Sequence, residues 1–276
     1  MTLRALVVVS LSLAAMLVAL VAVVRWLEPR LAFFPSAGED ATPRDFGIDF
    51  EPVSILTRDG QHLHGWWFHH PSPRASILYF HGNGGNLSMW TPILAGIANR
   101  GYELLAFDYR GYGLSDGRPT EQGLYRDVDA ALEQFAVRAS ADRPRVYWGR
   151  SLGVVMTSYA STIAAPDGLI LESGFPSARS LLRTSPILFG LSSLASYRFP
   201  AATFLQRRKT LTPVLVLHGD HDRIVPIAKG RALFDAISGP KQFVTIRGGD
   251  HNDATPAAAT YWQSVDEFIA RLAKRS

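Results

Sequence analysis

The sequence contains no cysteine among its 276 residues. Disulfide bonds, zinc sites built from thiolates and a cysteine nucleophile are therefore excluded. Charged residues are also scarce, at 19% against 47% hydrophobic residues, which excludes an intrinsically disordered chain. The net charge of +4 comes from scattered side chains and not from a basic stripe interleaved with aromatics. We therefore expect no nucleic-acid partner, and nothing in the composition indicates an oligomeric state.

A run without any charged residue stands near the N-terminus. Between residues 5 and 24 the only polar side chains are those of Ser10 and Ser12. At about 1.5 Å per residue, a helix over this run reaches roughly 30 Å, the thickness of a membrane's hydrocarbon core. We therefore expect residues 1–27 to form a single-pass transmembrane helix and residues 28–49 a juxtamembrane connector. Basic residues flank the run on both sides, so the side of the membrane on which the rest of the chain lies stays open.

A cleaved signal peptide is the alternative interpretation of this run. The apolar core of a signal peptide usually spans about 7–15 residues, which is shorter than the run, and no A-x-A-like cleavage site follows it. The expectation is therefore an uncleaved membrane anchor.

Short apolar runs alternate with amphipathic stretches from residue 76 onward. The expected strands are 77–80, 104–107, 146–148, 169–171, 214–217 and 243–246, and the expected helices are 87–99, 121–137, one after Ser151, 227–237 and 257–273. Runs that are apolar throughout are typical of strands covered on both faces. The alternation predicts an α/β fold, with a mostly parallel central sheet and helices on both faces. A hairpin is expected before it, because an Asp-Gly pair joins runs 53–57 and 62–68.

One interval inside the expected domain of residues 50–276 is too long for an ordinary connection. Residues 175–212 separate two predicted strands, are rich in Leu, Phe, Ser and Pro, and contain no Asp or Glu. Long loops in compact domains usually have a function. We therefore expect this insertion to be a short lid over an active site.

A candidate nucleophile follows the strand predicted at residues 146–148. Residues 149–153 read Gly-Arg-Ser-Leu-Gly, which is a G-x-S-x-G motif between a strand and a helix. In that context the serine, Ser151, stands on a sharp turn with its hydroxyl exposed, and the flanking glycines avoid collisions with neighbouring backbone. The N-terminus of the following helix directs free N–H groups towards a developing oxyanion.

A serine nucleophile requires a base, and the base requires an acid that orients it. His251 follows the last predicted strand, and Asp220 and Asp222 follow the strand before it. We expect Asp222 to be the acid, because Asp220 lies so close to the strand end that we expect it to cap the loop. Asp250 is adjacent to the histidine in sequence, so its carboxylate is expected to point away from the imidazole. The predicted catalytic residues are therefore Ser151, Asp222 and His251, in the chain order of this fold.

The second half of an oxyanion hole is expected in the glycine-rich loop after the strand at 77–80. This loop reads His-Gly-Asn-Gly-Gly-Asn at residues 81–86, and its glycines allow backbone N–H groups to approach a substrate closely. The backbone amides of Asn83 and Leu152 are the two expected donors.

Taken together, five motifs resemble one α/β-hydrolase family. They are the loop at 81–86, Asp-Tyr-Arg-Gly-Tyr-Gly at 108–113, the serine motif at 149–153, His-Gly-Asp-His-Asp at 218–222 followed by Val-Pro at 225–226, and Gly-Asp-His at 249–251. The family includes serine-aminopeptidase-like hydrolases and single-pass membrane-anchored members, some of which are protein depalmitoylases. The resemblance extends from about Phe33 to the C-terminus, and it also places the acid at Asp222. It implies a serine hydrolase but leaves the substrate open.

The predicted reaction is hydrolysis of a carboxylic ester or thioester through an acyl-enzyme intermediate, with a small-molecule or lipid-like acyl substrate and no metal or organic cofactor. A peptidase or amidase of the aminopeptidase-like kind is the alternative within enzymes, but it needs an acidic pocket for a free amino group. A catalytically idle, membrane-anchored binding protein is the other alternative. A metal site at His62, His64, His69 and His70 is disfavoured because no carboxylate with supporting spacing accompanies them.

Overall fold

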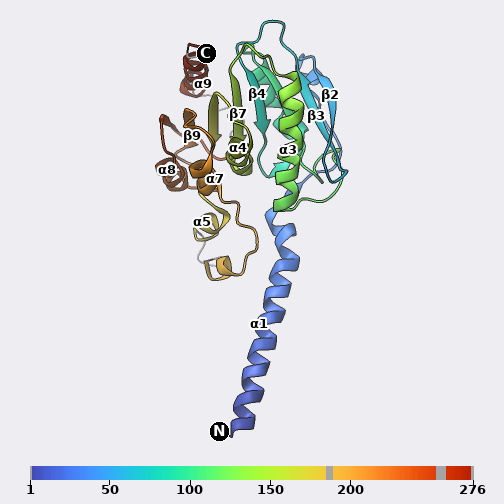
Figure 1. The fold of residues 1–276 in the computed structure, drawn as a ribbon, viewed down its shortest axis with the longest axis vertical. Helices are drawn as coiled ribbons and strands as arrows, with labels where there is room; N and C mark the ends of the chain where they lie inside the picture. Colours follow the sequence, from blue (N-terminus) through green and yellow to red (C-terminus); the bar gives the residue numbers. More distant parts are fainter. Residues whose placement is uncertain (1, 185–188, 253–258, 275–276) are drawn as a thin grey trace.

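An eight-stranded sheet forms the centre of the structure, a computed structural model that describes residues 2–184, 189–252 and 259–274 (Figure 1). The strand order is β10-β9-β8-β7-β4-β6-β3-β2. The strands are β2 (Glu51–Leu56), β3 (His62–Phe68), β4 (Ser76–Phe80), β6 (Glu103–Phe107), β7 (Arg145–Arg150), β8 (Gly168–Glu172), β9 (Val214–Gly219) and β10 (Lys241–Ile246). From β6 to β10 all neighbours are parallel, whereas β3 pairs antiparallel with β2 and with β6. The expected hairpin is therefore present at one edge of a mostly parallel sheet.

Helices cover both faces of the sheet. On one face, α3 (Glu121–Arg138), α4 (Leu152–Ile163), α7 (Ala201–Arg207) and α8 (Ile227–Asp235) contribute to one buried core, and on the other α2 (Leu87–Ala98) and α9 (Ala259–Ala273) contribute to a second. Strand β4 shows how the sheet separates the two cores. Leu78 and Phe80 belong to the first, and Ile77 and Tyr79 to the second, because successive side chains of a strand point to opposite faces.

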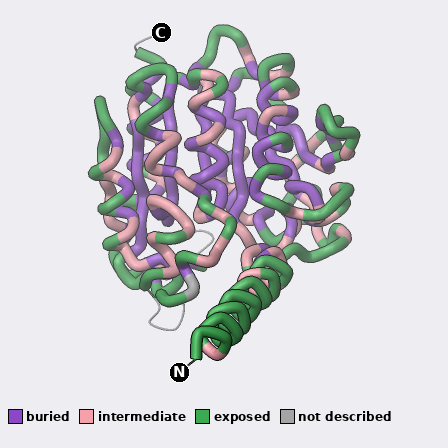
Figure 2. Tube along the Cα trace, turned by 60° about the horizontal axis from the view of Figure 1, so that its bottom comes forward, coloured by how far each residue is buried: buried purple, intermediate pink, exposed green. Residues whose placement is uncertain are grey.

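The N-terminal helix α1 (Leu3–Ala32) extends away from this domain, and almost its whole length is exposed (Figures 1 and 2). It is long and apolar enough to cross a membrane, the single such helix among the described residues. The helix continues through Ala32, five residues beyond the end expected from the apolar run at residue 27. Strand β1 (Phe34–Pro35) follows at once, and it pairs in parallel with β5 (Gly84–Gly85) in the glycine-rich loop.

The insertion at 175–212 contains two short α-helices within its described part, α5 (Ala178–Leu182) and α7, and the 3₁₀ helix η2 (Gly190–Ser193). Helices α5 and α1 both lie below the central sheet in Figure 1. Residues 185–188 of the insertion lie outside the described residues, as do 257–258 at the start of the last expected helix. The insertion therefore gathers at the end of the domain from which α1 extends.

Candidate active site

Ser151 stands on a strained turn between β7 and α4. Its φ of 54° and ψ of −113° lie in a region that a residue with a side chain rarely adopts. Two glycines make the turn possible: a Cβ on Gly149 would lie within 3.0 Å of the Gly153 carbonyl oxygen, and one on Gly153 within 3.0 Å of the Phe80 carbonyl oxygen. The motif therefore forms the sharp strand-to-helix turn that its sequence predicts.

The three side chains expected to form a triad lie in hydrogen-bonding order. Nε2 of His251 is 3.1 Å from Oγ of Ser151, and Nδ1 is 2.7 Å from Oδ2 of Asp222. With Nδ1 protonated, the imidazole donates to Asp222 and Nε2 is free to accept the serine proton. This is the arrangement that general-base activation of a serine requires.

The neighbouring aspartates have other partners. Oδ1 of Asp220 accepts a hydrogen bond of 2.7 Å from the backbone N–H of Gly248. Asp250 accepts one of 2.7 Å from the backbone N–H of His251, and its other oxygen is 2.9 Å from the guanidinium of Arg223. The carboxylate of Asp222 is the one that lies 2.7 Å from Nδ1 of the His251 imidazole.

A second histidine supports the carboxylate of Asp222. Nε2 of His218 is 3.4 Å from Oδ2 of Asp222, and Oδ1 accepts hydrogen bonds from the backbone N–H groups of Ile224 and Val225. Burial raises the pKa of Asp222, but the hydrogen bonds from His218, His251 and the Val225 N–H outweigh it, so its net pKa lies below the usual value. The carboxylate is therefore ionised at neutral pH and able to stabilise an imidazolium.

The glycine-rich loop, in which an oxyanion donor was predicted, lies beside the serine turn. A Cβ on Gly82 would be 3.5 Å from the Arg150 carbonyl oxygen, so the loop passes directly next to the residue before Ser151. Leu152 is the first residue of α4, where a backbone N–H has no partner within the helix. The hydroxyl of Tyr112 donates hydrogen bonds to the backbone oxygen of Asn83 at 3.0 Å and to its Oδ1 at 2.9 Å, which fixes the loop at Asn83.

The structure contains a buried ion pair next to the serine turn that the sequence did not predict. Arg150 lies 3.4 Å from Glu172 on the neighbouring strand β8, and its guanidinium donates to the backbone oxygen of His251. Glu172 also accepts hydrogen bonds from Tyr261 at 2.9 Å and Trp148 at 3.3 Å. This network holds the histidine loop against the serine turn. The signal available in the sequence was a charged residue inside the G-x-S-x-G motif.

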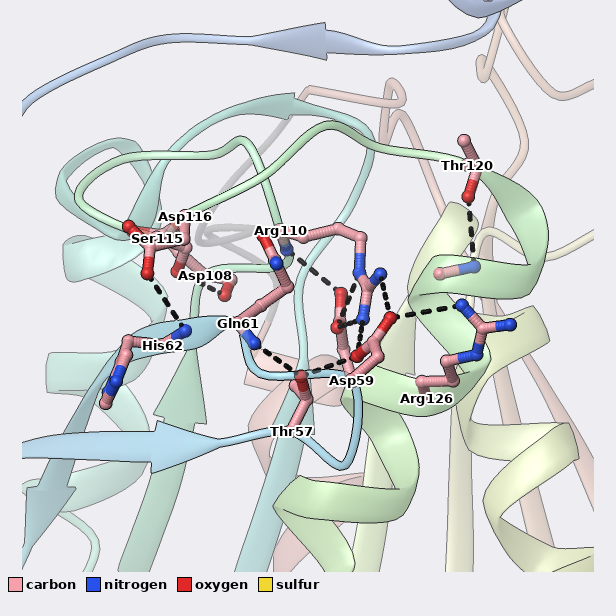
Figure 3. A network of polar contacts seen from close by, with 12 residues as sticks. Thr57, Asp59, Gln61, His62, Asp108, Arg110, Ser115, Asp116, Thr120 and Arg126 are labelled. Carbon is pink, nitrogen blue, oxygen red and sulfur yellow. Dashed lines mark hydrogen bonds and ion pairs between the residues drawn. The ribbon is translucent and has the colours of Figure 1, made fainter.

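The Asp-Tyr-Arg-Gly-Tyr-Gly loop at 108–113 contacts three elements around the site. Arg110 forms a buried ion pair of 2.8 Å with Asp127 of α3 and a second of 2.8 Å with Asp59 in the turn between β2 and β3 (Figure 3). Asp108 accepts a hydrogen bond of 2.9 Å from the N–H of Leu87, the first residue of α2. The loop therefore joins the hairpin, α2 and α3 around the site.

Asp108 and His81 form a buried pair under the glycine-rich loop, with Nε2 of His81 3.5 Å from Oδ1 of Asp108. Burial raises the pKa of Asp108 to about 8, although the hydrogen bond from Leu87 opposes this shift. Burial lowers the pKa of His81 to about 4. Between about pH 4 and pH 8 the predominant forms of both side chains are therefore uncharged.

The histidines of β3 have ordinary partners. His62 is 3.3 Å from the hydroxyl of Ser54, and Nε2 of His64 is 2.8 Å from Glu39. Within the described ranges no three His, Asp or Glu residues are arranged to hold a metal ion. In the basic run at 207–209, Arg208 is buried and donates hydrogen bonds to the backbone oxygens of Leu205 and Ser238. It therefore links the end of α7 to the residues that follow α8.

A family model described as serine aminopeptidase, S33, a hydrolase family, matches residues 71–212. An uncharacterized protein of Mycobacterium tuberculosis strain H37Rv is 34% identical over 228 residues, which cover 81% of this chain and 80% of that protein. The chain belongs to the serine aminopeptidase S33 family of α/β-hydrolases. Two further relatives are the uncharacterized YfhR of Salmonella typhimurium, 31% identical with 79% and 81% covered, and the mouse alpha/beta hydrolase domain-containing protein 17C, 29% identical with 72% and 61% covered.

Solved structures of two esterases share the fold. The esterase Pf2001 of Pyrococcus furiosus has a TM-score of 0.69 at 17% identity and covers 87% of this chain and 97% of its own. The esterase RhEst1 of Rhodococcus has a TM-score of 0.62 at 20% identity, with 80% and 99% covered. The α/β-hydrolase fold predicted from the sequence is confirmed. The chain is thus an esterase-like α/β-hydrolase of this family.

Proposed function

We propose that this protein is a membrane-anchored serine hydrolase that cleaves a carboxylic ester or thioester with Ser151 as its nucleophile. The observation that carries the proposal is the continuous contact from Ser151 to His251 at 3.1 Å and from His251 to Asp222 at 2.7 Å, on a strained turn. A binding protein has no need for a serine in a strained conformation hydrogen-bonded to an oriented imidazole.

The proposed reaction has two halves. Oγ of Ser151 attacks the acyl carbonyl carbon while Nε2 of His251 takes its proton, and the backbone N–H groups of Asn83 and Leu152 stabilise the oxyanion. The bond to the leaving oxygen or sulfur then breaks as His251 returns the proton to it. Water next attacks the acyl-enzyme and gives a proton to His251, which passes it to Oγ of Ser151 as the bond to the acyl group breaks and the acid leaves. Asp222 keeps the imidazole in the required tautomer throughout.

The acyl substrate is proposed to be small or lipid-like. The insertion at 175–212 has no acidic residue, so it offers no carboxylate to bind the free amino group of a peptide. Its described part places apolar side chains towards the core, among them Phe175, Tyr197 and Phe199. Both features favour an acyl group over a peptide, although the family name refers to an aminopeptidase.

The anchor is proposed to be α1, retained in the mature protein. The helix is exposed and apolar over most of its length, and Arg30 stacks on Trp26 near its C-terminal end, with the guanidinium 4.4 Å from the ring centre. Arginine and tryptophan are typical of the membrane interface. Cleavage of a signal peptide would shorten the chain. The intact mass of the protein purified from the membrane fraction therefore distinguishes a retained anchor from a cleaved signal peptide.

Hydrolysis of p-nitrophenyl esters and acyl thioesters from acetyl to palmitoyl tests the proposed activity, with Ser151→Ala as the control. We expect turnover that the substitution abolishes. Serine-dependent turnover of aminoacyl amides alone would favour the peptidase, and the absence of turnover on esters, thioesters and amides would contradict the proposal.

A further inference from the structure

The last turn of α1 is packed against the domain, unlike the rest of the helix. Glu28 is the one buried residue of α1 among its described side chains, at 9% exposure. Its carboxylate accepts hydrogen bonds from the backbone N–H of Ser196 at 3.0 Å, from that of Tyr197 at 2.8 Å, and from the hydroxyl of Ser196. Burying a carboxylate is costly unless such donors compensate for the lost water. The end of α1 is therefore fixed to the insertion at a defined position.

The residues after this turn continue the contact. Phe33 is buried, and its ring meets those of Tyr197 and Phe199 edge-on, at centroid distances of 5.5 and 6.0 Å. On the domain side, Glu121 of α3 accepts hydrogen bonds of 2.7 and 2.8 Å from the backbone N–H groups of Arg198 and Phe199. The segment at 196–199 is thus held between a carboxylate of α1 and a carboxylate of α3.

The same turn of α1 also reaches the glycine-rich loop. Nδ2 of Asn83 donates a hydrogen bond of 2.7 Å to the backbone oxygen of Ala32, the last residue of the helix. The strand pairing of Phe34–Pro35 with Gly84–Gly85 follows directly, and the N–H of Ser36 donates to the oxygen of Gly85 at 2.9 Å. Asn83 is therefore held on one side by Tyr112 of the domain and on the other by the end of α1.

We propose that Glu28 and the Ala32 carbonyl at the end of α1 help to position the active site, with Glu28 a positioning residue for the hydrolytic reaction. Glu28 holds the helix end in place, the carbonyl of Ala32 then orients Asn83, and the backbone N–H of Asn83 meets the oxyanion. This inference rests on the proposed hydrolase function. Misplacing a reacting or stabilising group by about 1 Å can cost about 100-fold in rate. The helix that anchors the chain thereby contributes to catalysis as well as to attachment.

A double-mutant cycle in the full-length protein, in detergent micelles, tests the proposal. Glu28→Ala releases the helix end, and Asn83→Ala keeps the backbone N–H but removes the side chain that contacts Ala32. We expect each single change to lower kcat about tenfold with KM changed less than threefold, because the oxyanion contact forms in the transition state. We expect the double variant to be about tenfold slower, and not 100-fold, since both changes break one connection.

Leu31→Ala is the matched control, because Leu31 lies in the same turn and is 69% exposed. We expect its kcat to stay within twofold of the unchanged protein. Should Glu28→Ala fail to accumulate, Glu28→Gln is measured in its place. Multiplicative effects in the double variant, or an unchanged kcat in Glu28→Ala, would overturn the proposal.

Hydrogen exchange separates this inference from the proposed function. The backbone amide of Ser36, which donates to the Gly85 oxygen, should exchange faster in Glu28→Ala than in Leu31→Ala, whether or not the protein hydrolyses any ester tested. Equal exchange in the two variants would overturn the role of Glu28 even in an active hydrolase. An inactive protein with the expected exchange would instead reject the proposed activity and keep the mechanical connection.

Discussion

The carbonyl oxygen of Phe80 occupies the space in which Gly153 would carry a Cβ: the two atoms would lie within 3.0 Å. Phe80 ends β4 and Gly153 lies in the first turn of α4, so this contact sets how closely the serine turn approaches the glycine-rich loop. The Phe80 oxygen and the Gly153 Cα both belong to the backbone of regular elements, so neither can move aside as a flexible side chain would.

Gly153→Ala should therefore destabilise the domain. We expect a loss of about 3 kcal/mol in the free energy of unfolding, because overpacking a fixed contact costs about 1–3 kcal/mol or more, and a loss of esterase activity as the serine turn shifts. Chemical denaturation and ester hydrolysis measure the two effects. Gly190→Ala is the control, since no atom of the described residues lies within 4 Å of its Cβ position. A Gly153→Ala protein with the control's stability would contradict the packing argument.

Asp222→Asn should nearly abolish activity while leaving the fold intact. An asparagine cannot hold the imidazole in the required tautomer, and the same change in a well-studied serine protease triad lowers kcat about 10⁴-fold. Asp220→Asn is the matched control, because Asp220 contacts the Gly248 N–H and not the imidazole. We expect its kcat to stay within a few-fold. Comparable losses in both variants would reject Asp222 as the acid.

Ser151 and Asp222 could be proposed from the sequence because each stands in a short motif whose residues are close together in the chain. The G-x-S-x-G motif lies at the junction of a strand and a helix, and the loop chemistry of residues 218–222 distinguishes Asp222 from Asp220. The parallel sheet also follows from short-range patterns, and strand positions agree with the expected ones within a few residues.

The contacts that were not predicted join residues far apart in the chain. Glu28 and Ser196 are 168 positions apart, and the Arg150–Glu172 pair depends on the register of two neighbouring strands. The charge-free run ends at residue 24, and the transmembrane helix was therefore expected to end by residue 27. In the structure the helix continues to Ala32, and the Glu28 carboxylate accepts hydrogen bonds from the insertion.

Asp127→Ala should cost far more stability than Glu133→Ala, although both remove the acidic partner of an arginine. Asp127 is fully buried against Arg110, and leaving a buried guanidinium without this partner costs about 3–5 kcal/mol. Glu133 pairs with Arg58 at the surface, where both side chains are more than half exposed, and no measurable change is expected. Urea denaturation of the two variants makes the comparison. Equal stabilities would show that the network in Figure 3 is not structural.

Asp108→Asn should alter how stability depends on pH. Burial raises the pKa of Asp108 to about 8 in the folded state, whereas an unfolded aspartate titrates near 3.9. The stability that comes from the neutral form is therefore complete below about pH 4 and is lost as the pH rises towards 8. The asparagine variant cannot ionise, so its stability relative to the unchanged protein should increase over this window, by up to about 1.4 kcal/mol per pH unit.

Thermal or urea unfolding at intervals from pH 5 to pH 9 measures this difference. The two proteins should diverge up to about pH 8 and run parallel above it. A difference that is constant across the range would show that Asp108 does not titrate there.

Labelling of the full-length protein with a fluorophosphonate, followed by peptide mass spectrometry, tests the central claim most directly. We expect a single adduct on Ser151, formed slowly or not at all in His251→Ala and Asp222→Asn, and absent from Ser151→Ala. An adduct on another serine, or none on the folded protein, would contradict the assignment of Ser151 as an activated nucleophile.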